Sequence, residues 1–123
     1  MTTATLTSLQ TAVDELNALI IDRQILEAMD RFYGDDIVMV EGVLNMTTAG
    51  KAANVAREKD FVENLTSWDA KLVSSVVDEK QGLAFSEWVL TYNHKQWGDI
   101  VSKQVSVQRW RDGAIVHEAF YKL

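Results

Sequence analysis

The segment IVSKQVSVQRWRDGAIVHEAFYK (residues 100–122) decides the fold class of this chain. Apolar and polar residues alternate along most of it, which is the pattern of strands that bury one face. In its middle stands Asp112-Gly113, a dipeptide typical of the two-residue turns of β-hairpins. The segment therefore predicts two long antiparallel strands, Ile100–Arg111 and Ala114–Lys122.

Three further strands are expected upstream of this hairpin. Trp68–Val77 and Leu83–His94 are rich in β-branched and aromatic residues and are separated by glycine-containing turns, so they extend the hairpin into a four-stranded antiparallel meander. A shorter strand, Asp36–Glu41, is indicated by an apolar, β-branched run, and a polar loop over Asn45–Gly50 follows it.

The first third of the chain predicts helices, because its apolar residues recur at spacings of three and four. Those of the first helix are Leu6, Leu9, Val13, Leu16 and Ile20. Thr7 and Gln10 have the spacing of a capping box at its start. A second helical pattern, with Asp22 as a possible cap, ends near Gly34, although one bent helix stays an alternative.

A third, weaker helix is expected over Ala52–Leu65, with the charges of Lys51–Lys59 on its solvated side. The order of elements is then helix, helix, strand, helix and four strands. Helices followed by a strand meander indicate an α+β fold, with helices on one face of an antiparallel sheet. The length of 123 residues suits a single domain.

Composition excludes several classes of function. The chain has no cysteine, and 18 acidic against 12 basic residues give a net charge of −6. Disulfides, thiolate nucleophiles and cysteine-based zinc sites are therefore excluded, and the acidic balance argues against nucleic acid as a partner. Apolar runs are far shorter than the ~20 residues of a membrane span. The N-terminus lacks the basic start of a signal peptide, so we expect a cytoplasmic protein without a membrane partner.

Two passages resemble a known superfamily. FYGDDIVMVEG (residues 32–42) resembles the helix-to-strand passage of nuclear transport factor 2-like proteins, and QVSVQRWRDGAIVHEAFY (residues 104–121) resembles the end of their SnoaL-like members. The resemblance implies a cystatin-like α+β cone over residues 1–123, in which a curved antiparallel sheet wraps the N-terminal helices. It also implies a pocket at the wide end and a homodimer formed through the convex face of the sheet.

Glu41 is the candidate catalytic residue. It ends an apolar strand, and in ketosteroid isomerases, which share the implied fold, the proton-moving carboxylate stands at the matching position. A carboxyl group in an apolar pocket has a raised pKa, which suits proton transfer near neutral pH. The structural alternative is that Glu41 points into solvent or accepts hydrogen bonds from loop amides.

The remaining isomerase machinery does not match. The resemblance places Asn17 and Ser106 where those isomerases carry the tyrosine and aspartic acid that donate to the enolate oxygen. Either residue can donate a hydrogen bond, but neither is a strong acid. Steroid isomerisation is therefore disfavoured.

A polar row and its apolar reverse side leave two interpretations open. Gln104, Ser106 and Gln108 share one face of their strand, because alternate residues point the same way, and Val101, Val105 and Val107 share the other. The pattern alone favours burial of the valines. The resemblance implies the reverse, with the polar row in the cavity as ligand-binding groups.

Other ligand-binding candidates come from the last strand and from the tryptophans. Glu118 and Phe120 share a face, and the resemblance favours Glu118 as a polar pocket group that could divide acid and base roles with Glu41. Trp88 and Trp110 are expected as pocket walls and Trp97 as a rim.

No cofactor or metal is expected. The two histidines, His94 and His117, lack metal-ligand spacing, and no phosphate-binding glycine loop or nucleophilic serine elbow is present. We therefore expect a protein that binds a small, largely apolar organic ligand. As an enzyme it would be a cofactor-independent isomerase, cyclase or lyase acting on a carbonyl compound. The alternative is a ligand-binding or dimerisation domain without catalysis.

Overall fold

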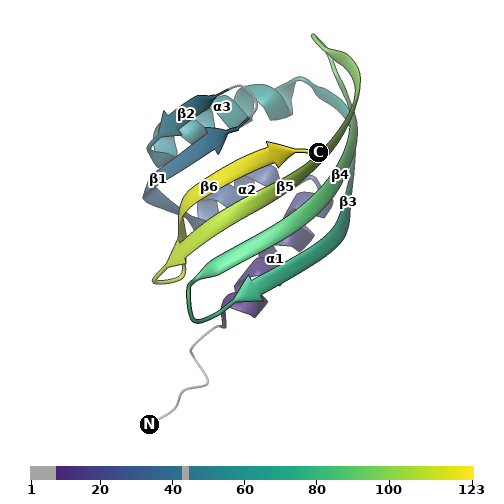
Figure 1. Ribbon diagram of the computed structural model, residues 1–123. Coiled ribbons are helices and arrows are strands. Elements are labelled where there is room, and N and C mark those ends of the chain that lie inside the picture. Colours follow the sequence, from purple (N-terminus) through teal and green to yellow (C-terminus); the bar gives the residue numbers. More distant parts are fainter. Residues whose placement is uncertain (1–7, 43–44) are drawn as a thin grey trace.

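The computed structural model describes residues 8–42 and 45–123, and within them the chain forms helices packed on one curved sheet (Figure 1). In chain order the elements are α1 (Leu9–Ile21), α2 (Ile25–Phe32), β1 (Tyr33–Glu41), β2 (Met46–Ala49), α3 (Lys51–Glu63), β3 (Leu65–Asp78), β4 (Leu83–His94), β5 (Gly98–Arg111) and β6 (Ala114–Lys122). The predicted α+β class is confirmed, and the four meander strands lie where the alternation indicated them.

The sheet has the strand order β2-β1-β6-β5-β4-β3 and curls around α1 and α2, which lie behind it in Figure 1. Strands β3 to β6 pair antiparallel, as predicted. The expectation of a wholly antiparallel sheet is wrong at one place, because β1 runs parallel to β6. A hairpin turn imposes antiparallel pairing only on consecutive strands, whereas β1 reaches β6 through α3 and four intervening strands.

The two N-terminal helices are separate, which excludes the single bent helix. Ser8 caps α1, and its side chain accepts a hydrogen bond from the Thr11 amide; the predicted cap Thr7 lies outside the described residues. Asp22 is the C-cap of α1 and not the N-cap of α2, which begins after Gln24. Between them Arg23 has a φ of 64°, a left-handed conformation that turns the chain between the helices.

The junction of α2 and β1 is tighter than the sequence indicated. The helix ends before Gly34 as predicted, but β1 begins already at Tyr33. A Cβ atom on Gly34 would lie 3.2 Å from the Ile115 carbonyl oxygen of β6, so glycine permits the close approach of the two strands. The expected loop over residues 45–50 contains the short edge strand β2, which pairs antiparallel with β1.

The core fills one end of the cone. Side chains from α1, β1 and β6 that are fully buried there include Val13, Leu16, Ile37 and Ile115. Asp112 and Gly113 have φ angles of 52° and 79°, which the type I′ hairpin turn requires at both central positions. The other end of the concave face is not filled in this way, and the candidate site lies there.

Candidate functional site

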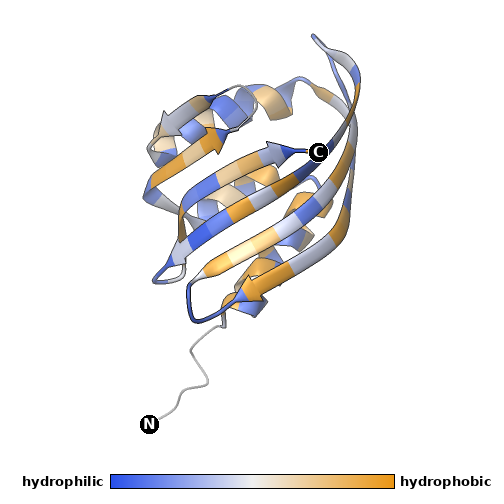
Figure 2. Ribbon diagram, viewed as in Figure 1, coloured by the Kyte–Doolittle hydropathy of each residue, from blue (hydrophilic) through white to orange (hydrophobic). Residues whose placement is uncertain are grey.

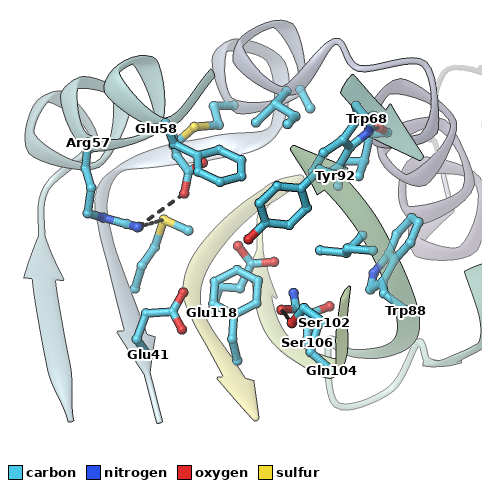
Figure 3. Close-up of a pocket in the computed structure, with 18 of the residues that line it drawn as sticks. Glu41, Arg57, Glu58, Trp68, Trp88, Tyr92, Ser102, Gln104, Ser106 and Glu118 are labelled. Atoms are coloured by element: carbon cyan, nitrogen blue, oxygen red, sulfur yellow. Dashed lines mark hydrogen bonds and ion pairs between the residues drawn. The ribbon is translucent and has the colours of Figure 1, made fainter. Parts of the chain in front are cut away.

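A cavity of about 460 Å³ lies between the concave face of the sheet and the helices α2 and α3 (Figure 3). Its lining is mostly apolar and aromatic, with a few carboxyl, amide and hydroxyl groups. Its polar, charged and aromatic lining residues include Tyr33, Glu41, Arg57, Glu58, Asp60, Trp68, Trp88, Tyr92, Trp97, Ser102, Gln104, Ser106, Gln108, Glu118, Phe120 and Lys122. A mostly apolar hollow with a few converging polar groups is typical of a small-molecule site.

Glu118 is the most deeply buried carboxyl group of the lining, with 2 % of its surface exposed. The Tyr33 hydroxyl donates to its Oε1, and the Gln108 amide nitrogen donates to its Oε2 over 2.6 Å. Burial raises the pKa of Glu118 to about 7, because desolvation disfavours the charged form more than the two hydrogen bonds favour it. Near neutral pH this group can therefore both accept and donate a proton.

Strand register brings these groups together. Gln108 on β5 and Met39 on β1 both stand opposite Glu118 on β6, so its carboxyl group is flanked on both sides. Tyr33 enters from the start of β1, where burial and the neighbouring Glu118 raise its pKa well above the ordinary tyrosine value. Tyr33 thus keeps its proton and acts as a donor.

Glu41 lines the same cavity from the end of β1, opposite Phe120 in the register. Its side chain is half-buried, and Figure 3 shows its carboxylate pointing into the hollow. Glu58 faces the cavity from α3 and forms an ion pair with Arg57, with 3.3 Å between the two side chains. Burial raises the pKa of Glu58, Arg57 lowers it, and Glu41 raises it further.

The polar row of β5 faces the cavity. Ser106 and Gln108 are buried and line it together with Gln104, whereas Val101 on the opposite side is 67 % exposed. This is the arrangement that the resemblance implied, and the pattern-based expectation of buried valines is wrong. Trp88, which is 4 % exposed, and Phe120 also line the cavity.

Asn17 and Trp110 do not line this cavity, although Trp110 is hydrogen-bonded to Gln108, which does. Asn17 is buried in α1 and donates to the Ser86 hydroxyl over 3.3 Å. Trp110 belongs to the core cluster, where its ring packs edge-on against Phe32 at 5.9 Å between centroids.

The architecture has close counterparts among solved structures. No protein-family model and no curated protein sequence matches the chain. A Mesorhizobium loti protein named as a SnoaL-like polyketide cyclase superposes with a TM-score of 0.77 at 17% identity, covering 94% of this chain and 99% of its own. A nuclear transport factor 2-like protein from Burkholderia pseudomallei gives 0.77 at 12% identity, covering 96% and 92%.

This chain has the nuclear transport factor 2-like fold. A third solved structure, from Catenulispora acidiphila, has a ketosteroid isomerase-like fold and was determined in complex with trimethylamine. It superposes with a TM-score of 0.71 at 12% identity, covering 87% of this chain and 84% of its own. The resemblance read from the sequence is thereby confirmed at the level of the fold.

Several residues that line the cavity were missed by sequence reasoning. Arg57 and Glu58 were expected on a solvated helix face, yet both line the cavity. The weak apolar stripe of α3 gave no signal for this, because much of the cavity wall comes from β4, β5 and β6, which are distant from α3 in sequence. Tyr33 was quoted within the resembling passage but received no role, since the partner that gives it one, Glu118, is 85 positions away.

His94 is a structural group. It is 2 % exposed, its Nδ1 accepts from the Gln96 amide, and its ring stacks on Trp97 at 3.7 Å between centroids. Within residues 8–42 and 45–123 no grouping of side chains could hold a metal ion. None of the helices in that part of the chain has the length and apolar character that a membrane span needs.

Proposed function

We propose that the cavity binds a small, largely apolar carbonyl compound and that Glu118 transfers a proton to or from the carbon beside its carbonyl group. The single observation that supports this is a deeply buried carboxyl group at the cavity wall, held by Tyr33 and Gln108, with a pKa of about 7. A general base works best when its pKa lies near the operating pH.

Proton removal beside a carbonyl group places negative charge on the carbonyl oxygen, which needs hydrogen-bond donors. Ser106 and Gln104 lie on the same face of β5 as Gln108, with alternate residues about 7 Å apart. The Ser102 hydroxyl donates to the Gln104 side-chain oxygen over 3.3 Å, which leaves the Gln104 amide NH₂ available for a ligand. In the proposed complex these groups orient the carbonyl oxygen while Glu118 faces the adjacent carbon.

Glu41, which the sequence favoured as the base, is the competing assignment for the proton transfer. It reaches the same cavity but lacks the two donors that hold Glu118. We assign the transfer to Glu118 and give Glu41 the place of a second carboxylate facing the ligand. A structural neighbour was determined in complex with trimethylamine, which supports the idea that proteins of this fold bind small organic molecules.

The test uses hydrogen exchange and needs no knowledge of the natural substrate. Cyclic ketones are first screened for binding through NMR shifts of the Trp68 and Trp88 indole N–H groups, which belong to cavity-lining residues. A ketone that binds is then incubated in D₂O, and loss of its α-proton signal is followed. We expect exchange by the wild type, a fall of about a hundredfold in Glu118→Gln, and a smaller fall in Glu41→Gln.

The outcomes separate the assignments. A fall confined to Glu41→Gln would transfer the role to Glu41. Binding without exchange would leave a ligand-binding domain without catalysis, the second candidate function. If no ketone shifts the indole signals, the carbonyl ligand itself is wrong. The absence of a cofactor and the cytoplasmic location stay predictions.

We also propose that two copies associate through the outer face of the sheet. Val76, Phe85 and Val107 stand next to one another across β3, β4 and β5, and Val76 and Phe85 are 63 % and 42 % exposed. Val101, further along β5, and Tyr121 on β6 add exposed apolar surface. Contiguous exposed apolar surface of this kind is typical of association sites.

A further inference from the structure

Trp110 is tied to the cavity although it does not line it. Its indole Nε1–H donates to the Oε1 of Gln108 over 3.0 Å, inside the core. The Nε2 of the same Gln108 donates to Glu118 over 2.6 Å. Trp110, Gln108 and Glu118 therefore form one chain of hydrogen bonds that runs from the core to the buried carboxyl group.

The orientation of the Gln108 side-chain amide follows from the chemistry of its two hydrogen-bond partners. An indole nitrogen can only donate, so it can bond only to the oxygen end of the Gln108 amide. The NH₂ end must then face Glu118. With the amide reversed, its oxygen would face a carboxyl oxygen, a contact that is favourable only when Glu118 is protonated.

We propose that Trp110 is a positioning residue for Glu118, because its indole N–H holds the Gln108 amide with its donor end toward the carboxylate. The wild-type arrangement favours the ionised, proton-accepting form of Glu118. The importance of this effect for turnover rests on the proposed function, whereas the effect on the protonation of Glu118 does not.

Other charged and titratable groups surround the same cavity and must stay unchanged in the test. Tyr33 and Glu41 face it from β1, Arg57, Glu58 and Asp60 from α3, and Lys122 from β6. Tyr33 donates to the other carboxyl oxygen of Glu118 and stays in place in the test. The path from Trp110 to Glu118 itself runs through Gln108, so a substitution at Trp110 acts on Glu118 through that amide.

The experiment follows the Glu118 carboxyl carbon by NMR between pH 4 and 9 in protein with ¹³C-labelled glutamate, assigned with Glu118→Gln. Trp110→Phe removes the donor but leaves an aromatic ring beside Phe32. We expect the midpoint of the Glu118 titration to rise by about one pH unit, since the amide is no longer held with its donor toward the charge. In a Gln108→Leu background the same substitution should cause no further shift of the Glu118 midpoint, because the effects of substitutions within one hydrogen-bond chain are not additive.

Phe32→Leu is the matched control for packing. It removes the edge contact on Trp110 but keeps the indole N–H, so it should lower stability while leaving the Glu118 midpoint in place. A midpoint unchanged in Trp110→Phe, or shifted equally in Phe32→Leu, would overturn the proposal. So would a full further shift in the Gln108→Leu background.

A measurement on the wild type remains if Trp110→Phe does not fold. The Trp110 indole N–H signal should titrate together with Glu118, because Gln108 connects them. The Trp68 indole, which donates to the Ile20 carbonyl over 2.8 Å, should not. A Trp110 indole signal that does not change with pH while Glu118 titrates would refute the inference. A shifted midpoint in a protein that exchanges no ketone proton would support the inference while the proposed function falls.

Discussion

The two faces of β5 reverse the usual polarity of a half-buried strand. Its enclosed face is polar and its exposed face is apolar. Toward the helices the strand presents Ser102, Gln104, Ser106 and Gln108, while outward it presents valines, among them Val101 at 67 % exposure. Figure 2 shows this alternation of hydropathy along the strands. Alternation thus identifies a strand with two unlike faces but does not say which face is enclosed.

Each face has its own physical requirement. Buried polar groups need partners, and Gln108 meets this by bonding both Trp110 and Glu118. Covering exposed apolar groups such as Phe85 with another surface lowers the free energy. The concave face thus suits a polar-tipped ligand, and the convex face suits a second protein surface.

The largest expected effect concerns pH and the concave face. The pKa of Glu118 is about 7 in the folded chain against an ordinary 4.5, so the folded state binds the proton more tightly than the unfolded state. The stabilisation is complete below about pH 4.5 and is lost as pH rises to about 7, for a total of about 3 kcal/mol. Urea unfolding of wild type and Glu118→Gln across this range measures it.

In Glu118→Gln this part of the pH dependence should disappear, because the amide does not titrate. Equal pH slopes for the two proteins would contradict the assignment of the raised pKa. The Glu118 carboxyl group on the concave face would then bind its proton no more tightly in the folded state than in the unfolded state.

A slightly smaller effect is expected for Phe85→Lys on the convex face. A charge in the proposed apolar interface between copies should weaken association about a hundredfold, or roughly 2.7 kcal/mol. Sedimentation equilibrium measures the change, and Glu27→Lys on the exposed side of α2 is the control that should leave association intact. A monomeric wild type would refute the dimer.

A third comparison places one substitution on each face of β5. Gln108→Leu should destabilise the fold by about 2 kcal/mol, since it leaves Trp110 and Glu118 without their partner. Val101→Thr on the exposed face should stay within about 0.5 kcal/mol. Both free energies come from denaturant titration at one pH, and similar losses would mean that the polar row is not the stabilising side.

The smallest effect on stability is expected for Ser106→Ala. Within the described residues no side-chain hydrogen bond holds the Ser106 hydroxyl, although the residue is 3 % exposed and lines the cavity. Its loss should change stability by less than about 0.5 kcal/mol but weaken a bound ketone about fivefold. A large loss of stability with unchanged ketone affinity would show that the hydroxyl serves the fold and not the ligand.

The sequence by itself determined the local features of this chain. The periods of its apolar residues and the Asp112-Gly113 turn predicted the helices and the four-stranded meander, because these depend on residues that are near in sequence. The passages around Tyr33 and Trp110 pointed to the fold through resemblance. They also placed Glu41 and Glu118 among the candidates that line the cavity.

Only the tertiary structure decided which groups meet. The parallel pairing of β1 with β6, the donors on Glu118 and the position of Glu58 join residues far apart in the chain. Asn17 and Trp110 were expected in the cavity but lie outside its lining, because the curvature of the sheet sets the end of the cone that stays open. Burial and charge proximity depend on that enclosed shape, so the pKa of Glu118 could not be read from its neighbours in sequence.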